Sequence, residues 1–296
     1  MQSEKAFQLV GLRPGHKENK VLYKRRRKDI PWISIGILGI LLLGCLFAEA
    51  VMPKDPAYLD LENFGRAPSR EFWFGTDTLG RDIFSCIWYG GRISVFIGFL
   101  AALIATVIGV VYGTVSGMAP RWLDNVLMRA LEIVLSIPGL LLILFVQAIF
   151  GKPNVVSVSV AVGITSWCAI AKVVRTEVRQ LRGNEYIMAA KSMGGGFFYI
   201  LRKHLAPNFI SSVMFMVVMN IRTAIGVEAT LSFLGMGLPI ETVTWGSMLS
   251  LAEKALMSRA WWMILIPGGF LVTLMMCITN VGNFLRKQAN KKESSL

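Results

Sequence analysis

The clearest pattern along the chain is a series of long apolar stretches separated by polar segments. A helix needs roughly 20 apolar residues to cross a bilayer core of about 30 Å, and backbone groups in lipid must be hydrogen-bonded within their own segment. Six stretches meet this length and predict six transmembrane helices, at residues 32–52, 93–118, 126–150, 155–174, 209–234 and 262–285. The pattern therefore predicts an all-α integral membrane protein.

The composition agrees with this prediction. Hydrophobic residues make up 54% of the chain and charged residues only 17%, whereas soluble domains average about 45–50% and about 25%. These values exclude a disordered or collagen-like chain and argue against a soluble enzyme. Three of the four cysteines fall in apolar stretches, so the sequence has no extracellular disulfide framework.

The distribution of basic residues predicts an orientation. Both tails and the segments at 118–129 and 172–203 alternate with the other connections and hold 22 of the 31 basic residues with seven acids. The opposite connections hold eight basic and eight acidic residues. The positive-inside rule then places both termini in the cytoplasm. We therefore interpret the basic excess as contact with anionic membrane lipid and not with nucleic acid.

This topology divides the chain into five parts. They are a basic cytoplasmic tail (1–30), a first transmembrane helix (31–52), an external segment (53–91), a five-helix core (92–286) with a cytoplasmic loop at 175–207, and a cytoplasmic tail (287–296).

The predicted external segment contains a turn-rich charged motif. Gly75 and Gly80 permit tight turns, and Asp77, Arg81 and Asp82 are close enough in sequence to form an ion and hydrogen-bond network. The segment is either a folded cap or a docking surface for an external partner, and composition alone favours the cap.

The cytoplasmic loop carries a more specific pattern. Arg175, Arg179 and Arg182 recur at i, i+4 and i+7, which makes one helical face basic. A short helix with small residues follows and stops at a glycine cluster around residues 194–196, and a second short helix is predicted at 197–205. The first helix fits either a partner's groove or the membrane surface, and helix character alone favours the surface.

Motifs for chemistry are missing from the sequence. It has no phosphate-binding loop, no His-Glu-x-x-His zinc pattern and no Gly-x-Ser-x-Gly elbow, so we assign no catalytic residue, no metal site and no nucleotide site. Charges within the spans are functional candidates because they are costly in lipid. Arg129 and Glu132 fit a local salt bridge, which leaves Arg222 and Glu228 as candidates, too far round their helix to pair. A proton relay cannot be built from them.

Four groups of residues match a family pattern, at 74–85 with 91–94, at 124–138, at 188–207 and at 228–246. The third follows the order Glu-Ala-Ala, three residues, Gly, nine residues, an apolar residue, any residue, then Leu-Pro. Here it is Met188-Ala189-Ala190, Gly194 and His204-Leu205-Ala206-Pro207. The chain resembles the permease subunits of ATP-binding-cassette importers, and more narrowly the C-type subunit of the dipeptide, oligopeptide and nickel group. It departs from the pattern at Met188, His204, Ala206 and Asn283.

The resemblance implies a type I importer transmembrane domain in a bacterial plasma (inner) membrane. The loop would be the coupling helix that sits in a cleft of an ATPase, with close approach at the two alanines and a sharp turn at Gly194. Its implied contact residues are Glu185, Tyr186, Met188, Ala189, Ala190, Gly194, His204 and Pro207.

The resemblance also implies the partners. They are a second, homologous permease subunit in a heterodimer, two ATPase subunits that bind ATP and Mg²⁺, and an external solute-binding protein; this chain binds no cofactor itself. Peptides are the implied cargo, with nickel or a metal chelate as the alternative. A secondary transporter or channel without an ATPase, and a membrane enzyme or scaffold, are the more distant alternatives.

Overall fold

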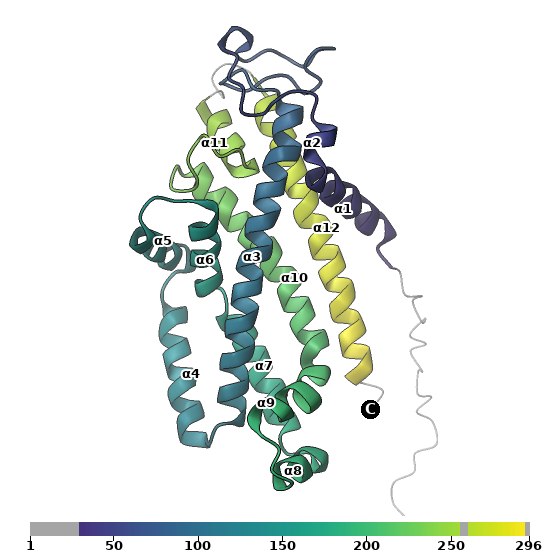
Figure 1. Cartoon of the computed structure of the whole chain (residues 1–296), viewed down its shortest axis with the longest axis vertical. Helices are drawn as coiled ribbons and strands as arrows, with labels where there is room; N and C mark the ends of the chain where they lie inside the picture. Colours follow the sequence, from purple (N-terminus) through teal and green to yellow (C-terminus); the bar gives the residue numbers. More distant parts are fainter. Residues whose placement is uncertain (1–29, 255–259, 294–296) are drawn as a thin grey trace, which may run out of the picture. The chain divides into compact units, whose positions relative to one another are not determined.

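The computed structural model describes residues 30–254 and 260–293, and every regular element in that part of the chain is a helix (Figure 1). The all-α prediction is therefore confirmed. The predicted tail at 1–30 lies outside the described residues except for its last residue, and so do residues 294–296. The elements are α1 (Trp32–Leu46), α2 (Ala48–Val51), η1 (Leu61–Asn63), α3 (Ile83–Met118), α4 (Arg121–Ser136), α5 (Gly139–Phe150), α6 (Val155–Thr165), α7 (Cys168–Leu181), α8 (Glu185–Ser192), α9 (Phe197–Ile200), the π-helix η2 (Leu201–Leu205), α10 (Ala206–Phe233), α11 (Trp245–Lys254) and α12 (Trp262–Glu293).

Helix α3 lies at the centre of the described bundle. It is 36 residues long and packs most extensively against α7, then against α10 and α6. Gly109, Gly113 and Gly117 recur every four residues on the side that meets α7, and a Cβ atom on Gly113 would lie 2.5 Å from the Ala171 carbonyl oxygen. Small residues at this spacing let two helix backbones approach closely.

Helix α3 begins at Ile83, ten residues before the predicted start of this span, so the boundary predicted at 91/92 falls inside a helix. Asp82 caps the helix by accepting a hydrogen bond from the Ser85 backbone N–H. Gly91 is required by packing, since a Cβ there would lie 2.5 Å from Cys45 Sγ. The prediction relied on uninterrupted apolar runs, and the polar and small residues before position 93 interrupt such a run, so it missed the first ten residues of the helix.

Two predicted spans are bent pairs of helices. Helices α4 and α5 meet at 91°, and α6 and α7 meet at 42°. Pro138 explains the first bend, because the residue before a proline is driven out of the helical region; Ile137 has φ −86° and ψ 130°. The prediction of a single helix at 126–150 and of another at 155–174 was therefore wrong.

Three described helices are individually long and apolar enough to span a membrane, and five spans result if each bent pair counts as one. Helix α1 is apolar but has only 15 residues, and α2 follows it after a break at Phe47. The predicted count of six and the cytoplasmic position of the termini stay predictions. Helix α12 continues to Glu293, so the boundary predicted at 286/287 also falls inside a helix.

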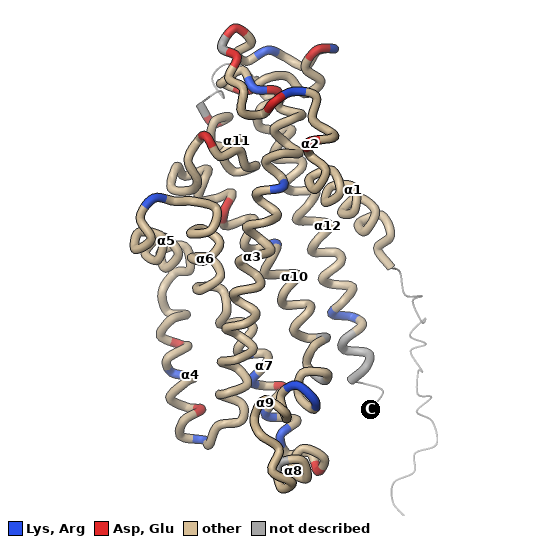
Figure 2. Tube along the Cα trace, viewed as in Figure 1, with Lys and Arg blue, Asp and Glu red and all other residues tan. Residues whose placement is uncertain are grey.

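The polar segments gather at the two ends of the bundle. Figure 2 shows charged residues concentrated around the segment before α3 and around α8 and α9, with few along the middle of the helices. The predicted external segment and the predicted cytoplasmic loop lie at opposite ends (Figure 1). All four cysteines are free and buried.

Candidate functional site

The loop between α7 and α10 has an inner and an outer side. Ile187 and Ala190, on one side of α8, are 1% and 4% exposed, and Ile187 packs with Ile200 and Leu205. Tyr186, Met188 and Ala189 are exposed. Of the two alanines that the motif places in this helix, Ala189 therefore faces outward, whereas Ala190 faces the loop itself.

Large apolar side chains project from the outer side of this loop. Met193 and Phe198 are 83% and 81% exposed, and Met188 and Tyr199 are about half exposed. Large exposed apolar patches mark sites of interaction with proteins or membranes. We call the exposed side chains of Tyr186, Met188, Ala189, Met193, Phe198 and Tyr199 the coupling surface, after the role that the resemblance implies for this loop.

Gly194 shapes the turn after α8. Its φ is +83°, a conformation that favours glycine because it has no Cβ. The Gly195 N–H donates to the Ala190 carbonyl oxygen at 3.0 Å, and a Cβ on Gly195 would lie 2.7 Å from the same oxygen. The predicted sharp turn at Gly194 is confirmed.

His204 connects the two short helices. Its ring centroid lies 5.9 Å from that of Tyr186 in α8 and 5.8 Å from that of Tyr199 in α9. The family pattern has an apolar residue here, and this aromatic cluster gives the histidine a packing role. Glu185 and Pro207 are exposed at the two ends of the loop, and Pro207 lies in the first turn of α10.

The predicted basic stripe on α7 lies half-buried against α4 and the end of α3. Arg175 Nε and Nη2 each donate to one oxygen of Asp124, at 2.6 Å, and Arg179 donates to the same carboxylate. Ser116 of α3 donates to Asp124 as well, at 2.7 Å. Bidentate pairs of this kind are among the strongest polar contacts in proteins.

The third arginine of the stripe extends this network. Arg182 Nη1 donates to the carbonyl oxygens of Gly117 and Ala119 at 3.0 and 3.1 Å, at the end of α3. A cation is favourable at the C-terminus of a helix, where the last carbonyls lack partners. Together the three arginines fix α7 to the corner between α3 and α4, three residues before α8 begins. We call this network the arginine clamp.

The structure brings together part of the predicted external network. Arg81 Nε donates to Asp77 Oδ2 at 2.7 Å with both side chains buried, and Asp77 Oδ1 accepts from the backbone N–H groups of Leu79 and Arg81. Asp82 does not join this ion pair. Its carboxylate caps α3 through the Ser85 N–H and hydroxyl.

The two glycines of this motif adopt conformations that other residues avoid. Gly75 and Gly80 have φ of +77° and +74°. A Cβ on Gly80 would overlap the Asp60 carbonyl, and one on Gly75 would lie 2.6 Å from the Arg66 carbonyl oxygen. The segment before α3 is therefore a tightly folded cap.

The two intramembrane candidates have separate surroundings. Glu228 is 1% exposed and accepts hydrogen bonds from the hydroxyls of Ser94, Ser232 and Thr244, at 3.3, 3.0 and 2.8 Å. It therefore ties α10 to α3 and to the segment before α11. Arg222 instead lines a hollow of about 520 Å³ beside α10, α11 and α12.

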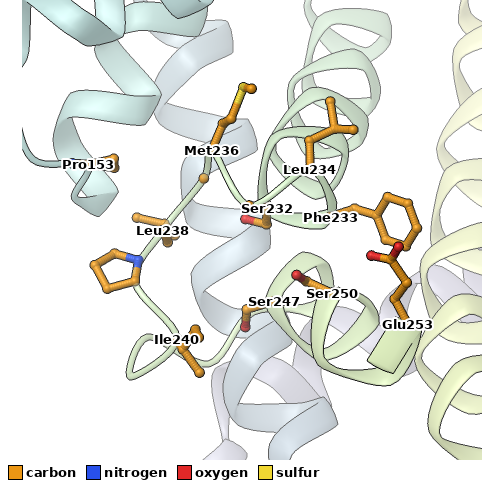
Figure 3. Close-up of a pocket in the computed structure, with 13 residues that line it drawn as sticks. Pro153, Ser232, Phe233, Leu234, Met236, Leu238, Ile240, Ser247, Ser250 and Glu253 are labelled. Carbon is orange, nitrogen blue, oxygen red and sulfur yellow. The ribbon is translucent and has the colours of Figure 1, made fainter. Parts of the chain in front are cut away.

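A second hollow, of about 500 Å³, lies where α10 turns into α11 (Figure 3). The connection at residues 234–240 runs around it, with Ser247 and Ser250 from α11 on one side and Pro153 on the other. Glu253 lies at its edge (Figure 3). Gly235, with φ +72°, ends α10 and starts this connection.

Comparison with known proteins decides the family. Residues 105–289 match the model of the binding-protein-dependent transport system inner membrane component. The chain belongs to this family. The permease motif at 188–207, the arginine clamp and Glu228 all lie within the matched residues, whereas the cap lies before them.

Relatives in this family cover most of the chain. The dipeptide transport system permease protein DppC of Bacillus subtilis is 33% identical over 95% of this chain and 88% of its own length. The oligopeptide transport system permease protein OppC of the same organism is 34% identical over 90% and 87%. The glutathione transport system permease protein GsiD of Pectobacterium atrosepticum is 37% identical over 75% and 74%.

A solved structure supports the fold. A chain of the MetNI methionine ABC transporter, in an inward-facing conformation, aligns with a TM-score of 0.54 at 19% identity, covering 69% of this chain and 96% of that one. The chain is therefore a multi-pass membrane permease with the type I importer fold, and it works with other subunits of an ABC transporter.

Sequence reasoning missed two sets of partners. Asp124 and Arg175 are 51 positions apart, and Glu228 and Ser94 are 134 apart, so nothing local in the sequence joins them. The arginine stripe on α7 could have indicated the clamp, because arginines on one face of a helix need hydrogen-bond acceptors. No sequence feature indicated that Ser94 and Thr244 contact Glu228.

Proposed function

We propose that this chain is the transmembrane permease subunit of an ATP-driven peptide importer in a bacterial plasma (inner) membrane. It forms half of the translocation pathway. The observation that carries this proposal is the coupling surface, an exposed apolar patch at the family's motif spacing, at the end of the bundle opposite the cap. Such a patch outside the apolar spans fits a groove of a protein partner.

The partners follow from the same surface. Two ATPase subunits bind the coupling surfaces of this chain and of a second, homologous permease, with which it forms a heterodimer. ATP and Mg²⁺ bind to the ATPase subunits. An external solute-binding protein delivers the substrate to the end that carries the cap, which requires both termini of this chain to be cytoplasmic and six spans to cross the membrane.

Peptides are the proposed cargo. The relatives' names refer to dipeptides, oligopeptides and glutathione, all of which are peptides.

The test uses a matched pair of substitutions in the complete transporter. Ala189→Trp adds bulk to the coupling surface, where a close-packed interface has little spare volume. Ala67→Trp makes the same change at an exposed position in the cap. We expect Ala189→Trp to release the ATPase or to uncouple ATP hydrolysis from peptide uptake in vesicles, and Ala67→Trp to retain the ATPase. Wild-type ATPase binding and uptake in the Ala189→Trp complex would refute the coupling assignment.

A further inference from the structure

Arg222 occupies the middle of a membrane-spanning helix. It lies 16 residues after the start of α10 and 11 before its end, which is about 24 Å and about 17 Å along the axis. A charged side chain at this depth is costly in lipid, and it faces protein or water when it occurs. Its surroundings therefore show what the helix face meets.

The described residues do not neutralise this charge. No carboxylate in the described part of the chain forms an ion pair with Arg222, and its Nε is buried without a hydrogen-bond acceptor. Glu228 is the nearest acid along the helix, but it points toward α3 and is satisfied by three hydroxyls. The guanidinium therefore has donors left for an acceptor from outside the chain.

The exposed face of α10 beside Arg222 is mixed, since Phe233 is exposed on it and both of its threonine hydroxyls donate to carbonyl oxygens of their own helix. Thr223 and Thr230 are both exposed, one i, i+7 repeat apart, and Gly226 lies between them. The exposed face of α3 is different, because Phe96, Phe99, Leu103 and Val107 are all apolar. The face of α3 suits lipid, whereas a face with an arginine and two threonines suits a hydrated pathway.

The hollow at Arg222 is large enough to admit part of a ligand. Its volume is about 520 Å³, and it is open along the surface of this chain. One charged group sits in a mostly apolar lining that includes Val227, Phe233, Leu249 and Leu271. This arrangement provides one charged group that can bind an anion, beside apolar side chains that do not select among ligand side chains.

We propose that Arg222 binds the C-terminal carboxylate of the peptide as it passes through the transporter. This inference rests on the proposed function, since peptides supply the carboxylate. A guanidinium offers two parallel N–H donors that match a carboxylate. Every linear peptide with a free C-terminus carries that group whatever its side chains are, so the anchor recognises the class and leaves the side chains to the apolar wall.

The first experiment asks whether this face meets water and attracts anions. Thr223→Cys is placed in a background without the four native cysteines, in the complete complex, and treated with anionic and cationic thiosulfonate reagents. We expect both reagents to label Thr223→Cys. The anionic reagent should react about tenfold faster when Arg222 is present than in the Arg222→Gln background. Leu103→Cys on the apolar face of α3 is the matched control and should not react. An unreactive Thr223→Cys would overturn the proposal.

The second experiment measures transport of one tripeptide with a free or an amidated C-terminus, both shown to bind the solute-binding protein and used at saturation. Arg222→Gln should lower uptake of the free peptide about tenfold and leave the amide unchanged, while Arg121→Gln, an exposed arginine at the start of α4, should change neither. Equal effects of Arg222→Gln on both peptides, or loss of the second permease from the complex, would overturn the inference. Absence of all peptide uptake by the wild-type complex would instead refute the proposed function.

Discussion

In the cap, at one end of the bundle, one ion pair is buried: Asp77 and Arg81 pair inside the fold, and glycines with positive φ fix the turns, although Phe64 and Trp73 are exposed. In the loop at the opposite end, apolar side chains point outward, as Met193 and Phe198 do. A buried ion pair that also accepts backbone hydrogen bonds holds a loop in shape, whereas an exposed apolar surface is stabilised when a partner covers it. The comparison indicates that the turns of the cap are held by its own contacts, and it supports the proposal that another subunit covers the loop.

The largest effect that tests this comparison is all-or-none. Phe64→Cys in the cap and Met188→Cys in the loop are both exposed positions. In intact cells we expect a membrane-impermeant thiol reagent to label the first and not the second, because the basic connections lie in the cytoplasm. Labelling at position 188, with none at position 64, would reverse the proposed topology.

Breaking the buried ion pair should have the next largest effect. Arg81→Ala leaves the Asp77 carboxylate buried and unpaired, which costs about 3–5 kcal/mol of local stability. We expect faster proteolysis of the cap and impaired transport, with ATPase binding unchanged. The double variant Asp77→Ala/Arg81→Ala should be less affected, since no lone charge remains. ATPase loss in Arg81→Ala alone would show that the two ends are not independent.

Overpacking the inner side of the loop should have a smaller effect. Ala190 is 4% exposed, so Ala190→Trp forces the loop apart and costs about 1–3 kcal/mol. Limited proteolysis should detect this opening without any ATPase present. Ala189→Trp, on the outer side, should leave the proteolysis pattern of the isolated permease unchanged. Identical patterns for both variants would contradict the two-sided description of α8.

The smallest effect is expected at Gly194. No neighbouring atom lies within 4 Å of a Cβ built there, so a substitution acts through backbone strain alone. Gly194→Val should cost about 1–2 kcal/mol, and Gly194→Asn less, because asparagine tolerates this conformation. Thermal unfolding and ATPase binding should follow that order. A larger loss in Gly194→Asn than in Gly194→Val would point to a steric contact with the partner.

Sequence reasoning performed best where the signal is local. The starts of the helices at Trp32, Val155 and Trp262 were predicted because apolar runs begin there. Asp77 and Arg81 were predicted to meet because opposite charges lie four residues apart in a turn-rich segment. Composition also gave the all-α class, because apolar segments in lipid have few alternatives to a helix.

Prediction failed where tertiary contacts decide the local structure. Gly91 and Arg92 read as the end of a polar segment, yet Gly91 packs against Cys45 and Arg92 pairs with Glu49 at 3.1 Å, inside α3. The bend at Pro138 is written in the sequence, but its angle depends on what α5 packs against. The inward direction of Ala190 likewise depends on helices that are distant in sequence.

The arginine clamp gives the permease a mechanical property. A single carboxylate, Asp124, holds two arginines of α7 to α4, while Arg182 holds the same helix to the end of α3. A hinge at this corner would absorb part of any stroke delivered at α8. Under the proposed function, a displacement of α8 by an ATPase therefore moves α7, α4 and the end of α3 together, as far as the bends between α4 and α5 and between α6 and α7.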